Sequence, residues 1–315
     1  MSSSFELSVI IPISERFDEV TELYQAYRSA LDTTGRSCEF IYVLDGEFPD
    51  CRAELEALRE AGEQITIIQL AKSFGEATAI TAGFENSSGE LIVNLPAYFQ
   101  VEPAELPKLL DAMDGHDMVI GRRWPRVDSG LNQFQTRAFH RLANALTESR
   151  FRDLGCGARV YRRQVMDEVP VYGDQHRFLP VLAQRRGFRI AEADLAQSTR
   201  DSFRRIYRPG VYPRRVLDVL TVFFLVKFTK KPLRFFGLIG TSMFVLGGAF
   251  LLYLVVQRLF MDMALADRPA LLLSALMVVL GAQLFALGLI GELIIFTHAR
   301  SLKEYTIAEI VNETT

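Results

Sequence analysis

Charged residues stand at the ends of two short apolar runs in the first half of this sequence. Asp45 follows the run 39–44, and Arg122 follows the run 118–121. A carboxylate at a strand end can accept a hydrogen bond from a base or a ribose hydroxyl, and arginine binds phosphate through paired N–H donors. These residue types predict a site for a phosphorylated ligand. Asp45 could equally form a turn, because Asp-Gly is a common turn pair.

The elements that would position these residues alternate between strand and helix. Strands are expected at 7–12, 39–44, 65–70, 91–95 and 118–121, and helices at 18–31, 53–61, 74–84, 134–146, 165–169 and 178–186, with a loop and strand at 153–161. This alternation predicts an α/β domain with an open, mostly parallel sheet and helices on both faces. Such sheets bind ligands beyond the carboxyl ends of their strands.

The charge distribution favours phosphate groups over nucleic acid as ligands. The net charge is −3, which gives no reason to expect a nucleic-acid partner, but arginine is concentrated between 122 and 215. That segment suits phosphates on a lipid or a donor, or it forms a solvated surface that faces a membrane. The three cysteines and four histidines are scattered, which predicts a reducing compartment and neither a disulfide framework nor a zinc site.

The last third of the chain carries two long uncharged segments. Residues 235–256 and 270–291 each reach the roughly 20 residues that a membrane-spanning helix needs; two buried core helices are the alternative. Residues 211–229 mix arginines with apolar residues and resemble a helix lying on the membrane surface. Basic residues before the first span and after the second predict that both termini are cytoplasmic. The N-terminus shows no signal peptide.

The stretch 69–103 resembles the centre of glycosyltransferase family 2, in the membrane-attached branch that transfers sugars to polyisoprenyl phosphates. Lys72-Ser73-Phe74-Gly75, followed by a helix of small residues, carries most of this likeness. The resemblance implies a GT-A nucleotide-sugar domain at 1–208, a juxtamembrane interfacial region at 209–234, a transmembrane hairpin at 235–296 (235–256 and 270–296) and a cytoplasmic tail at 297–315.

The same resemblance implies a donor site at the strand ends. Residues 12–15 are similar to the family's turn around the base and ribose, and residues 45–46 to its pyrimidine-binding segment. Lys72 would touch donor phosphates, unless it is an ordinary surface lysine. The implied donor-binding residues are Pro12, Glu15, Asp45, Gly46, Lys72 and Gly75.

Further motifs imply the acceptor site and the catalytic residues. Residues 121–123 resemble a segment in which an arginine meets the acceptor phosphate, and residues 153–161 resemble the family's Asp-x-Gly-x-Phe-Arg-Leu segment, with Ala158 in place of the Phe. The implied catalytic residues are Arg122, Asp153 and Arg159, with Asp153 orienting one of the two arginines. Arg122, Thr136 and Arg137 would bind the acceptor phosphate.

Pro96 and Tyr98 stand where the family has the two aspartates that hold a divalent metal on the donor diphosphate. A hard divalent ion requires carboxylate oxygens, which neither residue supplies. The family implies Mg²⁺ or Mn²⁺ as cofactor, whereas these positions predict that the usual metal site is missing. If the chain transfers sugar, arginines must neutralise the leaving diphosphate.

The resemblance therefore implies a transferase of the cytoplasmic (inner) membrane that moves sugar from a nucleotide-sugar to a polyisoprenyl phosphate for cell-envelope glycans. Its partners would be the nucleotide-sugar, the lipid and the membrane. Small residues in the spans (Gly237, Gly240, Gly247 and Gly248) permit a homo-oligomer. Two alternatives remain open: a catalytically silent scaffold or subunit of a glycan-assembly complex, and a regulator that binds nucleotide-sugar.

Overall fold

The computed structural model describes residues 5–14, 16–126, 151–169, 173–203, 232–261 and 269–298. It divides into two compact units, Met1–Val222 with Tyr305–Thr315 and Phe223–Glu304. Three of the predicted site residues, Glu15, Thr136 and Arg137, lie outside the described residues. The helices expected at 134–146 and 211–229 also lie outside them.

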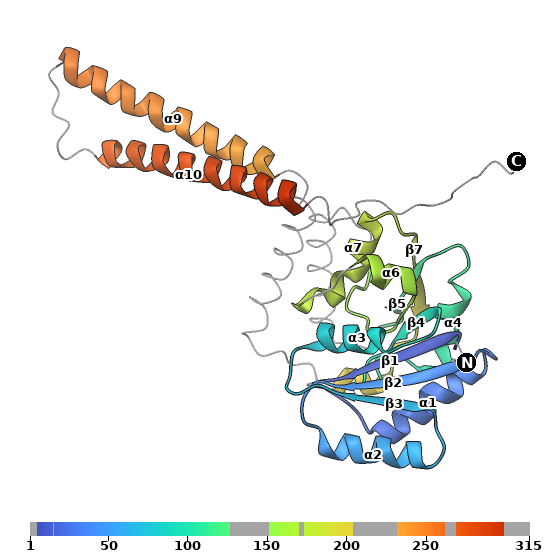
Figure 1. Ribbon diagram of the computed structural model, residues 1–315. Coiled ribbons are helices and arrows are strands. Elements are labelled where there is room, and N and C mark those ends of the chain that lie inside the picture. Colours follow the sequence, from blue (N-terminus) through green and yellow to red (C-terminus); the bar gives the residue numbers. More distant parts are fainter. Residues whose placement is uncertain are drawn as a thin grey trace, which may run out of the picture. The chain divides into compact units, whose positions relative to one another are not determined.

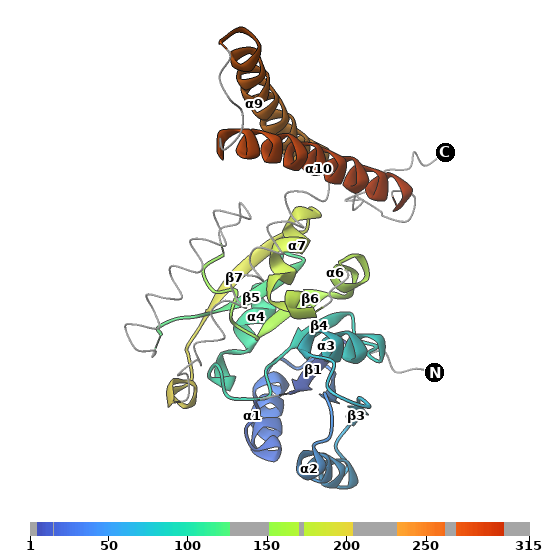
Figure 2. The same cartoon turned by 90° about the vertical axis from the view of Figure 1, so that its left-hand side faces the viewer.

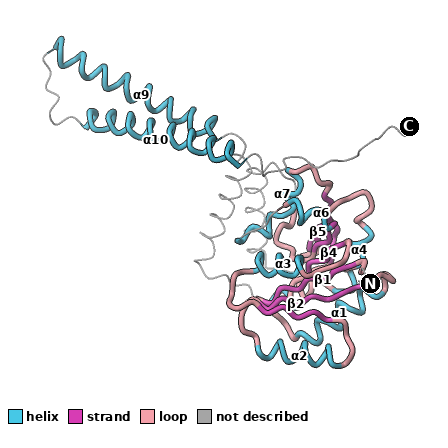
Figure 3. The backbone as a smooth tube through the Cα atoms, viewed as in Figure 1, coloured by secondary structure: helices cyan, strands magenta, loops and turns pink. Residues whose placement is uncertain are grey.

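The first unit is built on a seven-stranded sheet (Figures 1 and 3). Its strands are β1 Leu7–Ile13, β2 Cys38–Leu44, β3 Ile65–Gln69, β4 Leu91–Asn94, β5 Met118–Arg123, β6 Arg159–Arg162 and β7 Ile190–Leu195. The strand order is β3-β2-β1-β4-β6-β5-β7, and β6 alone runs antiparallel to its neighbours. The predicted α/β class and mostly parallel sheet are confirmed.

Helices cover both faces of this sheet. They are α1 Val20–Asp32, α2 Pro49–Glu60, α3 Glu76–Glu85, α4 Pro107–Asp111, α6 Arg163–Glu168 and α7 Leu179–Arg185, with 3-10 turns η1 Pro103–Glu105, η2 Gly173–Phe178 and η3 Thr199–Phe203. Alternate residues of β1, such as Val9 and Ile11, join the core that contains the buried side of α1. Ile10 faces the other way, towards Gly83 of α3.

Gly83 explains why the sequence places small residues on α3. A Cβ atom at this position would lie 2.6 Å from Cγ2 of Ile10. The helix can therefore approach the sheet closely only because the side chain is missing. This close packing holds the later part of α3 against β1 and β2.

The sequence did not predict β7. Its residues, IAEADL, include two acids and two alanines, which are poor strand formers. The strand forms because all six of its residues pair in parallel with β5. Tertiary pairing overrides the local preference here, and it places the segment that follows β7 at the carboxyl edge of the sheet.

The second unit is a hairpin of two 30-residue helices, α9 Pro232–Met261 and α10 Pro269–His298, which lie against each other in both views (Figures 1 and 2). The candidate spans Pro232–Phe260 and Pro269–Ile294 have mean hydropathies of 2.1 and 2.3. Only 17% and 11% of their most apolar windows are buried. Such exposure argues against buried core helices and suits contact with lipid.

Glycines bring the two helices into backbone contact. A Cβ atom at Gly240 would lie 2.6 Å from the carbonyl oxygen of Gly281, and one at Gly281 would lie 2.6 Å from the amide nitrogen of Phe244. A Cβ atom at Gly248 would meet nothing within 4 Å. The hairpin therefore closes at Gly240 and Gly281, as small residues allow in membrane helices.

We expect Gly240→Ala to destabilise the hairpin by about 1–3 kcal/mol, the usual cost of overpacking. The helices must separate to make room for the added methyl group. Gly248→Ala is the matched control; its methyl group meets no neighbour and alanine is the better helix former, so stability should stay the same or rise by up to about 1 kcal/mol. Denaturant titration of the purified protein in detergent measures both. Equal effects of the two substitutions would contradict the glycine contact.

Candidate functional site

The carboxyl ends of the six parallel strands lie at one edge of the sheet, and the antiparallel strand β6 begins at that edge. The loops at this edge carry most of the predicted site residues. They come from parts of the chain that are far apart in sequence, and the sheet register brings them together.

Asp45 follows β2 and is 3% exposed. Its carboxylate accepts hydrogen bonds from Ser73 Oγ (2.9 Å), from the Phe74 amide (2.7 Å) and from the Gly75 amide (3.0 Å). The side chain therefore ties the end of β2 to the turn that starts α3. A carboxylate has about four acceptor positions, so one more donor can be bound. The nucleotide contact of Asp45 stays a prediction.

The turn after β3 presents its residues to solvent. Gly75 has a φ of 98° and Gly46 a φ of 123°, both of which favour glycine. Lys72 is exposed, with its ammonium 5.2 Å from the ring centre of Phe74. Pro12 is buried within β1, directly beside Val43 of β2. These positions leave the phosphate contact of Lys72 a prediction.

Asp153 pairs with Arg123, a residue that the sequence analysis did not select. The Arg123 Nε and Nη2 groups donate to the two Asp153 oxygens at 2.7 and 2.8 Å, and both side chains are 2% exposed. The sequence predicts that Asp153 orients Arg122 or Arg159; the structure shows it bonded to Arg123 instead, and the orienting role stays a prediction. Side chains alternate along a strand, so Arg123 points inward and Arg122 outward.

A second buried carboxylate extends this pair. Asp201, in η3, accepts from Arg123 Nη1 at 3.5 Å and from Gln197 at 2.8 Å. On its other oxygen it accepts from Arg16 at 3.0 Å. Burial by itself lowers the pKa of Arg123, but the Asp153 and Asp201 carboxylates raise it well above its usual range. The guanidinium therefore stays charged inside the protein.

Arg122 and Arg159 lie in contrasting environments. The Arg122 side chain is 20% exposed, pairs with Asp194 at 3.2 Å and has its guanidinium 5.0 Å from the Trp124 ring centre. Arg159 is 5% exposed and donates to the carbonyls of Cys156, His176, Leu154 and Arg177. A guanidinium has five N–H donors, so one donor of Arg159 remains for the catalytic role implied for it, which stays a prediction.

Glu76 begins α3 beside His176, with Oε2 and Nε2 separated by 3.1 Å. Burial raises the pKa of Glu76, but the hydrogen bond and charge of His176, helped by Arg177 and Arg159, outweigh it and lower the pKa to about 2. His176 is buried, and its Nδ1 atom has no hydrogen-bond partner among the described residues. The pair joins α3 to η2.

Pro96 and Tyr98 lie in the loop after β4. The Tyr27 hydroxyl donates to the carbonyl oxygens of both, at 3.0 and 3.2 Å. The guanidinium carbon of Arg16 lies 3.6 Å from the centre of the Tyr98 ring. These contacts fix the loop in place. At positions 96 and 98 it carries a pyrrolidine ring and a phenol.

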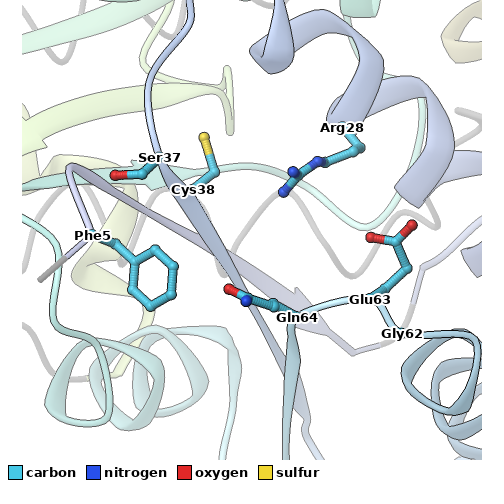
Figure 4. Close-up of a pocket in the computed structure, with 7 residues that line it drawn as sticks. All are labelled: Phe5, Arg28, Ser37, Cys38, Gly62, Glu63 and Gln64. Atoms are coloured by element: carbon cyan, nitrogen blue, oxygen red, sulfur yellow. The ribbon is translucent and has the colours of Figure 1, made fainter. Parts of the chain in front are cut away.

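A pocket of about 300 Å³ lies at the opposite edge of the sheet (Figure 4). Phe5, Arg28, Cys38 and Gln64 are among its lining residues, and Cys38 is the first residue of β2. It therefore opens at the amino ends of the strands. None of the predicted site residues lines it, so we do not assign it to the site.

Comparison with known proteins identifies the fold and the family. Residues 8–169 match the family Glycosyl transferase family 2, over slightly more than half of the chain. The chain belongs to this family. It is 31% identical to undecaprenyl-phosphate 4-deoxy-4-formamido-L-arabinose transferase of Klebsiella pneumoniae (strain 342), over 98% of this chain and 94% of that protein. A protein of the same name from Enterobacter sp. (strain 638) is 30% identical, again over 98% and 94%.

Solved structures share the GT-A fold of this transferase at low identity. Mannosyl-3-phosphoglycerate synthase from Rubrobacter xylanophilus matches with a TM-score of 0.54 and 14% identity, over 70% of this chain and 73% of that one. Glucosyl-3-phosphoglycerate synthase from Mycobacterium tuberculosis, in complex with Mn²⁺, uridine diphosphate and phosphoglyceric acid, gives 0.50 and 17%, over 70% and 79%.

The residues of this family 2 transferase do not fit a metal ion at positions 96 and 98. A proline side chain has no oxygen, and a tyrosine phenol is protonated near neutral pH. In the part of the chain that the structure describes, no three His, Cys, Asp or Glu side chains form a metal-binding group. The carboxylates of the edge, Asp45, Asp153 and Asp201, already accept hydrogen bonds from protein donors.

Sequence reasoning missed Arg16, Arg123 and Asp201 in this transferase. The signals for two of them were present: Arg123 follows directly on Arg122, and Arg16 comes three residues after the end of β1. What the sequence lacked was the register that brings residue 201 beside both arginines. That register depends on β7, which the sequence did not predict.

We expect Arg123→Ala to lower the free energy of unfolding by about 3–5 kcal/mol, because it leaves the buried Asp153 carboxylate without its charged partner and removes one of the contacts of Asp201. Arg122→Ala is the matched control on the next residue. Its ion pair with Asp194 is exposed, so the loss should be at most about 1 kcal/mol. Urea titration of the two variants tests the contrast, and similar losses would refute the assignment of Arg123 as the buried partner.

Glu76 gives the transferase a stability that depends on pH. Its folded pKa of about 2 lies below the usual 4.5, so its contribution is complete above 4.5 and disappears as the pH falls towards 2. At pH 6 we expect Glu76→Gln to cost about 1–2 kcal/mol, less than the full shift because the side chain is partly exposed. This cost should shrink between pH 4.5 and pH 3.

The measurement is the unfolding midpoint of wild type and variant at several pH values. Glu85→Gln, at the exposed far end of the same helix, is the control and should show little cost at any pH. A cost at Glu76 that stays constant down to pH 3 would speak against the ionised pair with His176.

Proposed function

We propose that this protein transfers a sugar from a nucleotide-sugar to a polyisoprenyl phosphate at the cytoplasmic membrane. The observation that carries the proposal is the match, along 98% of this chain, to transferases named for undecaprenyl phosphate. That match includes the hairpin as well as the GT-A domain. The uridine diphosphate in the related synthase complex supports a nucleoside diphosphate as the carrier of the sugar.

The chemistry asks little of the protein in the way of acid–base catalysis. The acceptor phosphate is already anionic near neutral pH, so no strong base has to activate it. Positioning and charge stabilisation are the main requirements. The edge supplies both: Asp45 fixes the turn before α3, and Arg122 holds a partly exposed guanidinium at the end of β5.

The membrane assignment follows from the hairpin. Each helix is roughly 45 Å long at 1.5 Å per residue, which exceeds the hydrocarbon thickness of about 30 Å. Arg234 lies in the first turn of α9, and Lys303 follows α10 in the sequence. We propose two spans, with the GT-A domain and both termini in the cytoplasm. In this proposed orientation the site would face the cytoplasm, where nucleotide-sugars are available.

The test is turnover by the full-length protein in detergent, with undecaprenyl phosphate and a panel of nucleotide-sugars, followed as labelled lipid. We expect a lipid-linked sugar, and a kcat/KM about 10–100-fold lower for Arg122→Gln, because a charge-assisted hydrogen bond to phosphate is lost. Arg162→Gln, on the sheet near Asp117, is the control and should keep full activity.

The silent scaffold makes the opposite prediction. Folded wild-type protein would then give no lipid-linked sugar with any donor, under conditions in which the Klebsiella relative is active. A regulator would bind the donor and still show no turnover.

A further inference from the structure

Arg16 presents a positive charge over the side chain that replaces the second metal-binding position. β1 and β4 are parallel neighbours in the sheet, so the loops after them meet at its carboxyl edge. Arg16 comes from the first loop and Tyr98 from the second, with the guanidinium carbon 3.6 Å from the ring centre. This distance is well inside the 6 Å range of a cation–π contact.

The protein holds the Tyr98 platform from several sides. Gln100, which is 1% exposed, donates to the Tyr98 hydroxyl at 2.8 Å and accepts from the Gly157 amide at 2.6 Å. The Phe99 amide donates to Asp18 at 2.9 Å, and the Asp18 amide donates back to the Ala97 carbonyl at 2.8 Å. The phenol ring is therefore a preformed support and not a loose surface side chain.

Arg16 is the accessible member of an otherwise buried charge cluster. Its side chain is 31% exposed, whereas those of Asp201, Arg123 and Asp153 are 2% exposed or less. Asp201 binds Arg16 through Nη1 only. Among the described residues, the Nε and Nη2 groups of Arg16 have no hydrogen-bond partner. Two N–H groups of a fixed guanidinium can thus meet an incoming anion.

The surroundings of Tyr98 also disfavour a divalent cation. A divalent cation near Tyr98 would stand beside the Arg16 charge, which repels it, and it would find no carboxylate at 96 or 98. An anion meets the opposite conditions. The same location that is unfavourable for Mg²⁺ or Mn²⁺ is therefore favourable for phosphate oxygens.

We propose that Arg16, supported by Tyr98, binds the diphosphate of the nucleoside diphosphate sugar directly, and that donor binding and transfer need no divalent ion. This inference rests on the proposed function for its transfer step. Arg16 thereby acts on the donor, a role distinct from that of Arg122 on the acceptor.

The transfer balances without a metal or an added base. The bond between the anomeric carbon and the β-phosphate oxygen breaks, and its electron pair stays on that oxygen. A bond forms from an oxygen of the acceptor phosphate to the anomeric carbon, so one negative charge moves from the acceptor to the leaving diphosphate. Arg16 donates N–H groups to the oxygen that gains this charge, as preorganised donors do for developing anions.

Binding and turnover, each measured in EDTA and then in Mn²⁺, test the proposal. The binding probes are nucleoside diphosphates and the matching monophosphates, with the full-length protein in detergent. Wild type should bind the diphosphate more tightly than the monophosphate in EDTA. Arg16→Gln should weaken diphosphate binding by about tenfold or more, with little effect on the monophosphate. Arg16→Lys keeps the charge and loses the planar stack, so its affinity for the diphosphate should lie between those of wild type and Arg16→Gln.

Two further variants separate binding from folding. Tyr98→Leu removes the ring and leaves the Arg16–Asp201 pair, and it should weaken diphosphate binding several-fold. Arg28→Gln is the matched control: this arginine also lies near an aromatic ring, Phe40 at 5.9 Å, and pairs with Asp32, but it lines the pocket at the opposite edge. It should bind as wild type does. Unfolding midpoints show whether each variant is folded.

Each outcome decides the inference. Diphosphate binding that requires Mn²⁺, or that survives Arg16→Gln unchanged, overturns it and leaves the proposed transfer standing. Binding in EDTA that is lost in Arg16→Gln supports the binding role of Arg16. If no lipid is glycosylated under either condition, the proposed function fails together with the transfer step, and the binding role stands; turnover that appears only with Mn²⁺ overturns the metal-free transfer step. Folded wild-type protein that binds no nucleoside diphosphate under either condition overturns both.

Discussion

A guanidinium inside a protein is costly unless carboxylates and hydrogen bonds compensate for its lost hydration. Arg123 meets this requirement between Asp153 and Asp201, and the rest of the edge depends on that solution. The pair with Asp153 fixes the loop before β6 against the end of β5. The contact with Asp201 fixes the segment after β7. Through Asp201 the constraint reaches Arg16, after β1, which joins strands at the two sides of β4.

Two other buried polar side chains at this edge, Asp45 and Arg159, are also compensated by hydrogen bonds. Asp45 binds the amide groups of Phe74 and Gly75, the two residues that precede α3. Arg159 donates to four carbonyls, those of Leu154 and Cys156 in the loop before β6 and those of His176 and Arg177 in η2. Polar side chains thus take the place of secondary structure where the strands end, and they give irregular loops a single arrangement.

Much of the fold was predictable because it depends on local pattern. The apolar runs of β1, β2 and β4 are nearly continuous, and the two long helices carry few charged residues, so composition alone identifies them. The site was less predictable because its contacts join residues 16, 98, 123, 153 and 201. The choice between Arg122 and Arg123 depends on which side of β5 faces inward, and two adjacent arginines carry no local signal for that. The antiparallel position of β6 and the poor strand formers of β7 could not be predicted from local pattern either, so the sequence did not indicate which residues meet at the site.

The position of Arg16 against Tyr98 has an evolutionary consequence. Replacement of Tyr98 by aspartate would place a new carboxylate beside a guanidinium, and the two would form an ion pair before any cation could be bound. The proline at position 96 adds a second required change. An ion site would therefore require changes at positions 16, 96 and 98. No single one of these changes would create it. Because no single substitution creates the ion site, variants that keep Arg16 are favoured.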